Sequence, residues 1–247
     1  MTPRIVEIRQ GILKKNDQLA GVLRDRFRAT GVFVVNLVSS PGTGKTALLE
    51  RTLKDLTLRG FKVAALVGDL ETDNDARRLA RSGVPVRQIQ THGICHLEAE
   101  MIERHLDGWD LTTFDFLFIE NVGNLVCPVD FDLGENLSIM ILSVPEGDDK
   151  PAKYPVMFRV ADLVLLTKAD LLDVLGDDFK VEAAIRHVRE LANAAPVLTV
   201  STRRTDGIGA FIDWIRDQRA ARKSGAQQRP RIVRDELTAG RGAVAHP

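Results

Sequence analysis

Short apolar runs alternate with amphipathic segments along most of the chain. Continuous apolar strands separated by helices are typical of a parallel sheet that is buried on both faces. The pattern therefore predicts an α/β fold, with a mostly parallel sheet covered by helices on both faces and ligands bound beyond the carboxyl ends of the strands. The expected strands are 32–39, 61–68, 86–90, 114–121, 137–144, 162–168 and 196–201, and a last helix is expected from about Ile208 to Arg219.

The two ends of the chain depart from this alternation. Apolar residues of segment 1–30 recur at helical spacing with a break near Asn16-Asp17, which predicts an N-terminal helical segment that packs on the main domain or on a partner. Segment 220–247 is rich in Arg, Gly, Ala and Gln and has little periodicity, which predicts a disordered tail. The main domain is expected to span 31–219.

Composition narrows the class of protein. The chain has 247 residues with 34 basic and 34 acidic side chains, and this balance gives no reason to expect a nucleic acid or a membrane surface as partner. No stretch approaches the roughly 20 apolar residues needed to cross a bilayer, and the first residues lack the apolar core of a secretory signal. With only two cysteines, a cytoplasmic location with free thiols is expected rather than a disulfide framework.

The turn after the first expected strand carries a phosphate-binding motif, Ser39-Ser40-Pro41-Gly42-Thr43-Gly44-Lys45-Thr46. Its glycines allow backbone N–H groups to surround phosphate oxygens, while Lys45 reaches the β- and γ-phosphates and the Thr46 hydroxyl ligates Mg²⁺. Ser39 stands where the usual G-x-x-x-x-G-K-[ST] pattern has its first glycine, so the motif alone is a weaker match. The strand before it and the helix after it support a P-loop nucleotide hydrolase, with Ser40 to Thr46 in contact with the nucleotide.

Acidic residues at two further strand ends complete the expected phosphate side of the site. Glu120 is expected to hold Mg²⁺ directly or through water, and the Gly123 amide to contact the γ-phosphate. Asp69 is a second candidate ligand for Mg²⁺. The alternative for Asp69 and Glu120 is that each only caps a following turn. With Lys45 and Thr46, these two carboxylates form the predicted catalytic set.

Thr167-Lys168-Ala169-Asp170 resembles the Asn-Lys-x-Asp motif that reads the guanine base in GTPases. The Asp170 carboxylate would accept two hydrogen bonds from guanine, which adenine cannot donate, and Lys168 would lie along the base. Thr167 replaces Asn and removes one amide donor. Ser201 lies where a loop backs the guanine in small G proteins. The alternative for Asp170 is a helix N-cap, which is compatible with base reading.

Both cysteines follow expected strands that end at the nucleotide edge. Cys95 and His96 are adjacent, and Cys127 lies four residues after Gly123. Two thiolates and an imidazole suit Zn²⁺ or Ni²⁺, whereas the alternative is that each cysteine is a small buried apolar residue. One chain offers three good ligands and a closed tetrahedral site takes four, so we expect the metal at or near a homodimer interface.

The motifs in this order resemble the HypB family, the hydrogenase nickel-incorporation GTPases among the dimerising P-loop GTPases. The resemblance covers about 5–217 and rests on SSPGTGKT, GDLETDNDA, HGICHLEAEM, FLFIENVGNLVCP, VPEGDDKPAKYP and LLTKADLL. It implies GTP hydrolysis coupled to nickel delivery into the large subunit of [NiFe] hydrogenase, a HypA-like partner, and a metal site at Cys95, His96 and Cys127. The adjacent Cys-His pair and the GNLVCP segment differ from the Cys-Pro-His arrangement of the urease accessory protein UreG.

Three other functions remain open at this level. The chain could be a P-loop ATPase or small-molecule kinase with structural cysteines, although Asp170 argues against ATP. It could be a urease-type nickel GTPase. It could also be an interaction module in which the nucleotide only sets a conformational switch, and this reading overlaps with a slow GTPase.

Overall fold

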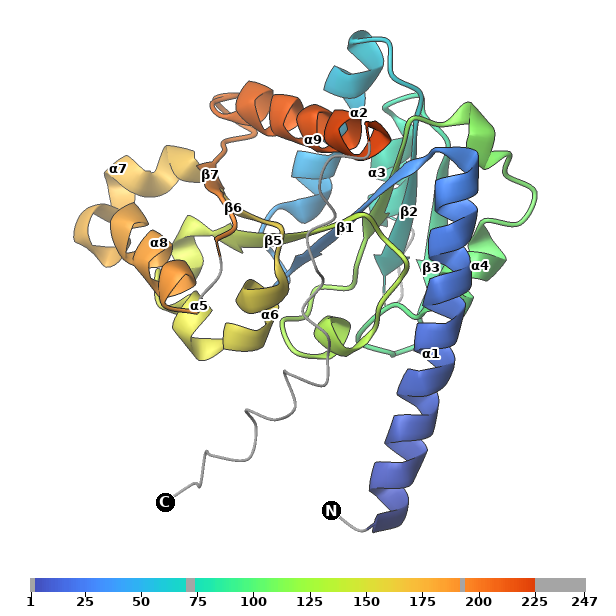
Figure 1. Ribbon diagram of the computed structural model, residues 1–247. Helices are drawn as coiled ribbons and strands as arrows, with labels where there is room; N and C mark the ends of the chain where they lie inside the picture. The colour runs from blue at the N-terminus through green and yellow to red at the C-terminus, as the bar shows by residue number, and fades with distance from the viewer. Residues whose placement is uncertain (1–2, 70–73, 192–193, 225–247) are drawn as a thin grey trace.

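The computed structural model describes residues 3–69, 74–191 and 194–224. Its centre is a seven-stranded sheet in the order β3-β2-β4-β1-β5-β6-β7, and every neighbouring pair of strands is parallel (Figure 1). This confirms the predicted fold class. The strands are β1 (Phe33–Ser39), β2 (Val63–Asp69), β3 (Val86–Gln90), β4 (Phe116–Glu120), β5 (Leu137–Ser143), β6 (Leu163–Thr167) and β7 (Val197–Thr199).

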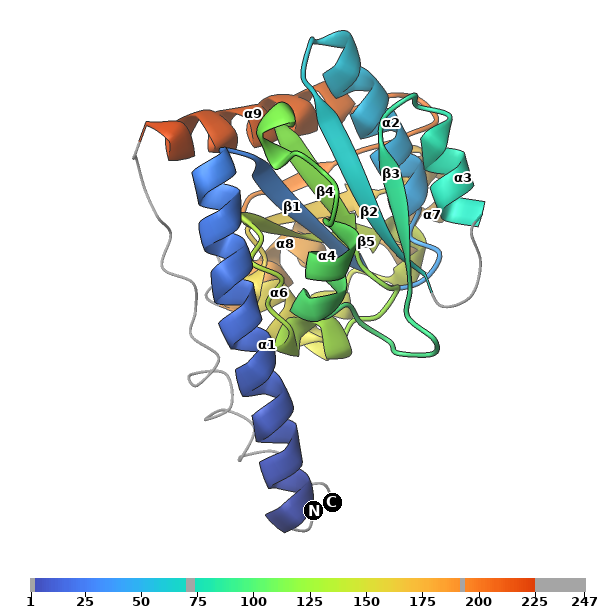
Figure 2. The same ribbon diagram turned by 90° about the vertical axis from the view of Figure 1, so that its right-hand side faces the viewer.

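Helices cover both faces of the sheet (Figure 2). The helices α2, α3 and α9 pack on one face, and α1, α4, α6 and α8 pack on the other. Successive strand residues point to opposite faces, so Val35 lies in the first of these cores and Val34 in the second. The helices are α1 (Pro3–Thr30), α2 (Lys45–Leu58), α3 (Asn74–Ala80), α4 (Ala99–His105), α5 (Lys150–Lys153), α6 (Pro155–Val160), α7 (Leu172–Leu175), α8 (Val181–Glu190) and α9 (Ile208–Lys223).

Because all seven strands run in the same direction, their carboxyl ends lie at one edge of the sheet. β1 lies between β4 and β5, so the connections leave it toward both sides of the sheet. Parallel sheets bind ligands at such a switch in strand order. The loops that follow β1, β3, β4 and β6 therefore meet at this edge.

The described chain is helical at both ends. α1 runs without interruption through Asn16-Asp17, where the apolar spacing breaks, and the Asn16 side chain is buried there and hydrogen-bonded to neighbouring segments. α9 continues to Lys223 instead of ending near Arg219, so the start of the expected tail is helical. The rest of that tail, from residue 225 onward, lies outside the described residues.

Within the described ranges, no helix combines the length and hydropathy that a membrane-spanning segment needs.

The segment after Cys127 lies against the middle of α1. Gly134 has a φ of 77°, and a Cβ atom at this position would come within 2.8 Å of the Ala20 carbonyl oxygen. A glycine is thus needed here both for the left-handed backbone and for close approach to the helix.

Gly134→Ala should destabilise the fold by about 1–3 kcal/mol through backbone strain, and further through the clash with α1. Gly60→Ala is the matched control, because Gly60 has a φ of 84° but open space where its Cβ would lie. Urea unfolding of both variants separates the two effects. Equal losses would mean that the approach of Gly134 to α1 contributes nothing to stability.

Candidate nucleotide and metal site

The phosphate loop connects β1 to α2. Gly42 and Gly44 adopt φ angles of 76° and 88°, and nothing lies within 4 Å of where a Cβ would be on either glycine. The loop therefore curves around open space in front of the first turn of α2, where backbone N–H groups and the helix dipole favour an anion. Ser40 is half-buried and Pro41 is exposed on the same loop.

Ser39, the departure from the usual motif, is buried and organises the loop. Its hydroxyl accepts hydrogen bonds from Thr43 Oγ1 at 2.9 Å and from Lys45 Nζ at 3.4 Å, and it donates one to the Ser40 carbonyl at 2.7 Å. A glycine could make none of these contacts. The hydroxyl thus ties the start of the loop to the lysine.

Three of the four predicted catalytic residues meet at the end of β4. Thr46 Oγ1 donates a hydrogen bond of 2.7 Å to Glu120 Oε1, and Lys45 Nζ lies 3.9 Å from the same oxygen. Glu120 is buried. A hydroxyl beside a carboxylate is an oxygen donor set that suits Mg²⁺. Asp69 ends β2, which neighbours β4, but its side chain lies outside the described part of the structure.

The expected base-reading residues gather beside the phosphate loop at the end of β6. Lys168 has a φ of 58°, and its Nζ donates a hydrogen bond of 2.8 Å to the Gly42 carbonyl. Thr167 Oγ1 donates one of 2.8 Å to the Thr43 carbonyl. The threonine thus holds this segment against the phosphate loop.

Asp170 and Ser201 come together from different strands. Ser201 Oγ donates a hydrogen bond of 2.7 Å to Asp170 Oδ1. This bond holds the pKa of Asp170 below its ordinary value, with Arg203 and Arg204 contributing in the same direction. Asp170 is therefore an anionic acceptor at neutral pH, as recognition of guanine requires.

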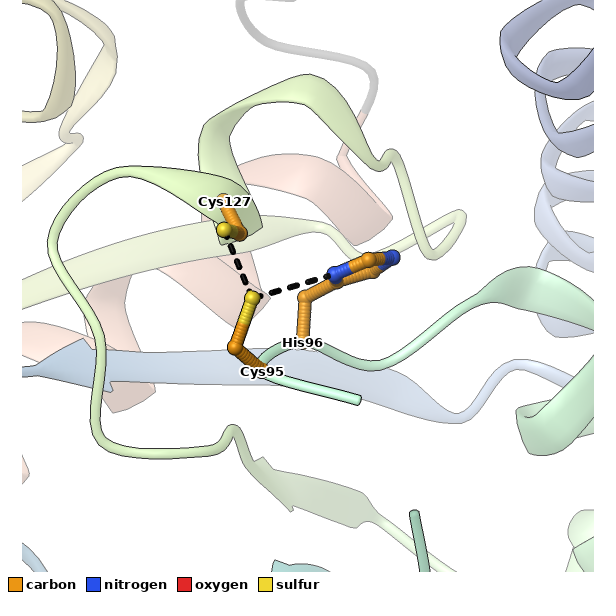
Figure 3. Close-up of side chains that lie close together, drawn as sticks. All are labelled: Cys95, His96 and Cys127. Carbon is orange, nitrogen blue, oxygen red and sulfur yellow. Dashed lines mark hydrogen bonds between the residues drawn. The ribbon is translucent and has the colours of Figure 1, made fainter. Parts of the chain in front are cut away.

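The three predicted metal ligands form one cluster (Figure 3). The Sγ atoms of Cys95 and Cys127 lie 2.7 Å apart, and His96 Nδ1 lies 3.9 Å from Cys95 Sγ. One ligand atom from each residue falls within 4.8 Å of the other two. His96 stacks on Phe131 with a ring-centroid separation of 3.7 Å, which fixes the plane of the imidazole.

The protonation of this cluster follows from its surroundings. The hydrogen bond with Cys95 and burial raise the pKa of Cys127 to about 11. Burial lowers the pKa of His96, partly offset by Glu98, whose Oε1 lies 3.4 Å from His96 Nε2. The imidazole is thus kept in its neutral, metal-binding form, and a bound metal would displace thiol protons.

Gly123 joins the two halves of the site. A Cβ on Gly123 would lie 3.0 Å from the Pro41 backbone, so the loop that leads to Cys127 begins in contact with the phosphate loop.

Two asparagines that the sequence analysis did not single out also shape this loop. Asn124 Oδ1 accepts hydrogen bonds from the N–H groups of Val126 and Cys127 and so turns the chain toward the thiol. Buried Asn121 accepts one from the Leu97 N–H, directly after His96. An Asn a few residues before a Cys is a turn signal that could have indicated Asn124, whereas Asn121 depends on a long-range contact.

The fold and the site together define a P-loop nucleotide-binding protein with a Cys/His cluster at the same edge of the sheet. Residues 33–198 match the family described as "CobW/HypB/UreG, nucleotide-binding domain". The chain is 51% identical over 219 residues to the hydrogenase maturation factor HypB of Azotobacter vinelandii, covering 89% of this chain and 71% of the relative. The chain therefore belongs to the HypB group of the CobW/HypB/UreG family.

Solved structures of HypB have the same fold. A crystal structure of HypB from Helicobacter pylori in complex with nickel superposes with a TM-score of 0.79 at 41% identity, covering 87% of this chain and 99% of that one. The hydrogenase maturation factor HypB from Archaeoglobus fulgidus gives 0.76 at 37% identity, with 83% and 99% covered.

Gly123→Ala should weaken nucleotide binding by roughly tenfold, about 1.4 kcal/mol, because the added methyl pushes the loop away from Pro41. Gly209→Ala, in the last helix, meets nothing within 4 Å and is the matched control. Calorimetric titration of both variants with GDP makes the comparison. Wild-type affinity in Gly123→Ala would contradict the close contact between the two loops.

Proposed function

We propose that this chain is a GTPase that binds nickel or zinc through Cys95, His96 and Cys127 and assists nickel insertion into [NiFe] hydrogenase. The observation that carries the proposal is the cluster of two thiols and one imidazole, within 4.8 Å, at the sheet edge that also bears the phosphate loop. An ATPase or kinase with structural cysteines would have no need of an imidazole at this place. The nickel complex of the Helicobacter pylori relative supports the same reading.

Residues of this chain have separate roles toward GTP. The amides of segment 40–46 and the Lys45 ammonium bind and neutralise the phosphates, and the Gly123 amide faces the γ-phosphate. Asp170, oriented by Ser201, accepts hydrogen bonds from guanine, while Lys168 lies along the base.

The remaining catalytic groups act on the metal side of the phosphates. Thr46 and Glu120, with Asp69 from the neighbouring strand, would hold Mg²⁺, which would stabilise negative charge on the phosphates.

The metal is the cargo of this reaction, and the structure supports a homodimer as its carrier. Ile94 and Val126, directly before Cys95 and Cys127, are 37% and 56% exposed. Apolar side chains at the rim of a three-ligand cluster favour a second copy of the chain, which would cover them and supply further ligands. The loop between Gly123 and Cys127 would then respond to both nucleotide and metal.

Three further expectations follow from this proposal. A HypA-like nickel chaperone supplies the metal, and the hydrogenase large subunit receives it. The whole exchange takes place in the cytoplasm, where thiols stay reduced.

The wild-type protein should prefer GTP to ATP by a factor of roughly 30 or more, because two unpaired polar groups against adenine cost about 2–6 kcal/mol. Asp170→Asn should shift the preference toward xanthine nucleotide, whose edge has a carbonyl where guanine has an amine. Competition against a fluorescent guanine nucleotide measures each affinity. Lys45→Ala is the control that should bind and hydrolyse neither nucleotide, and equal affinities of the wild type for ATP and GTP would refute base reading by Asp170.

Nickel and zinc affinity should differ between the GDP-bound and GTP-analogue-bound states by roughly 5–150-fold, an ordinary coupling of about 1–3 kcal/mol. The reason is that one short loop contacts the phosphate loop at Gly123 and the metal at Cys127. Metal titrations in both nucleotide states, with the oligomeric state followed by light scattering, test this.

Cys127→Ala is the control for the metal titration and should lose both the affinity and the difference between states. The coupling would be refuted if the GDP-bound and GTP-analogue-bound proteins had identical metal affinity and if neither nucleotide nor metal changed dimerisation.

A further inference from the structure

The N-terminal helix contacts both chain segments that carry the metal ligands. Asn16, in the middle of α1, is 5% exposed. Its Oδ1 accepts a hydrogen bond of 2.8 Å from the Ala99 N–H, and its Nδ2 donates one of 2.9 Å to the Asp132 carbonyl. Ala99 follows closely after the Cys95-His96 pair, and Asp132 follows closely after Cys127. One side chain thus joins the two segments.

The amide group is suited to this task. It carries a donor and an acceptor on one rigid plane, so it can satisfy an N–H of one segment and a carbonyl of the other. The Ala99 N–H lies at the start of α4, where helix amides have no acceptor within the helix, and the Asp132 carbonyl lies in an irregular segment. An apolar side chain at position 16 would leave them without these partners.

The packing of α1 on the domain does not require a buried asparagine at position 16. Ala20, Leu23 and Phe27 of α1 are buried in the core with Leu97 and Leu133, and these apolar contacts hold the helix. Burying a polar amide among them is unfavourable unless both ends are paired. The pairs it makes are with the segments that position the metal ligands.

Charged side chains of α1 reinforce the same two contacts. Arg24 forms an ion pair with the Asp132 carboxylate, and Lys15 Nζ lies 2.8 Å from Glu100 Oε2. These groups lie nearer the surface, where ion pairs contribute little on their own. The buried amide is therefore the contact that sets the spacing of the two segments.

We propose that Asn16 is a positioning residue for the metal site, which holds the segment after His96 and the segment after Cys127 at the separation that brings the two thiols together. The inference rests on the proposed metal-binding function. Ligands that are already in place bind a metal more tightly than ligands that must first be ordered. Groups that orient metal ligands typically change affinity by about 10–100-fold when removed.

Two variants of the full chain test the proposal. Asn16→Ala removes both hydrogen bonds, and Asn16→Leu removes them while keeping a side chain that is likewise branched at Cγ, so that no cavity opens under the helix. Phe27→Leu is the matched control, because it weakens the packing of the same helix at a buried apolar position. Thermal unfolding of the three variants measures how much stability each one loses.

The first measurement is nickel affinity, by competition with a chelator, together with the thiolate-to-nickel charge-transfer absorption. We expect both Asn16 variants to bind nickel about 10–100-fold more weakly with an altered absorption, and Phe27→Leu to keep the wild-type spectrum and affinity. Unchanged affinity and spectrum in the Asn16 variants would overturn the proposal. So would an equal loss in Phe27→Leu at matched stability.

The second measurement needs no metal. Diamide adds to one thiol, and the other thiol then displaces the reduced diamide from that sulfur, so that a disulfide forms within one chain and diamide carries away two electrons and two protons. The rate of this second step reports how often the Sγ atoms of Cys95 and Cys127 meet. We expect the Asn16 variants to react about tenfold more slowly than wild type and Phe27→Leu. If wild type binds no nickel but this difference is found, the proposed function fails while the positioning role of Asn16 stands. Equal rates would overturn the positioning role.

Discussion

The parallel pairing of β1 with β4 is the constraint on which the rest of the site depends. The register sets Leu37 beside Glu120, and the Asn121 N–H continues the pairing with the Leu37 carbonyl at 3.0 Å. Both strands therefore end at nearly the same height. The phosphate loop and the loop that leads to Cys127 leave the sheet side by side, and the Thr46 hydroxyl reaches the Glu120 carboxylate across the gap.

Beyond the ends of these strands, side-chain amides replace the ladder of backbone hydrogen bonds. Asn124 turns the loop toward Cys127, Asn121 receives the N–H of Leu97, and Asn16 receives that of Ala99. Each amide pairs a backbone N–H in a loop or at the start of a helix, so the loops gain fixed positions without forming strands. The phosphate loop and the cluster of Cys95, His96 and Cys127 thus lie at one edge of the sheet, where these hydrogen bonds fix the loops.

The sequence analysis was most accurate where the pattern is local. Segment 86–90, the weaker of the expected strands, is β3 as expected, and the glycine-rich turn after β1 leads directly into α2. It was least accurate where a polar residue has a distant partner. Asn16 only interrupts the apolar spacing in the sequence, whereas in the structure its buried amide is hydrogen-bonded to Ala99 and Asp132. Ser39 replaces the first glycine of the usual phosphate-binding motif and so weakened the match, yet its hydroxyl accepts hydrogen bonds from Thr43 and Lys45.

The sequence by itself determined the parallel α/β architecture, the phosphate loop and the residue types of the Cys/His cluster, because strand periodicity and short motifs depend on neighbours in the chain. Only the tertiary structure decided which strand ends are adjacent, and hence that Cys95 and Cys127, 32 residues apart, bring their Sγ atoms to 2.7 Å. It also decided that α1 joins the two segments bearing the ligands. Such contacts depend on strand order and on the pairing of buried backbone groups, which are properties of the folded chain rather than of any local window.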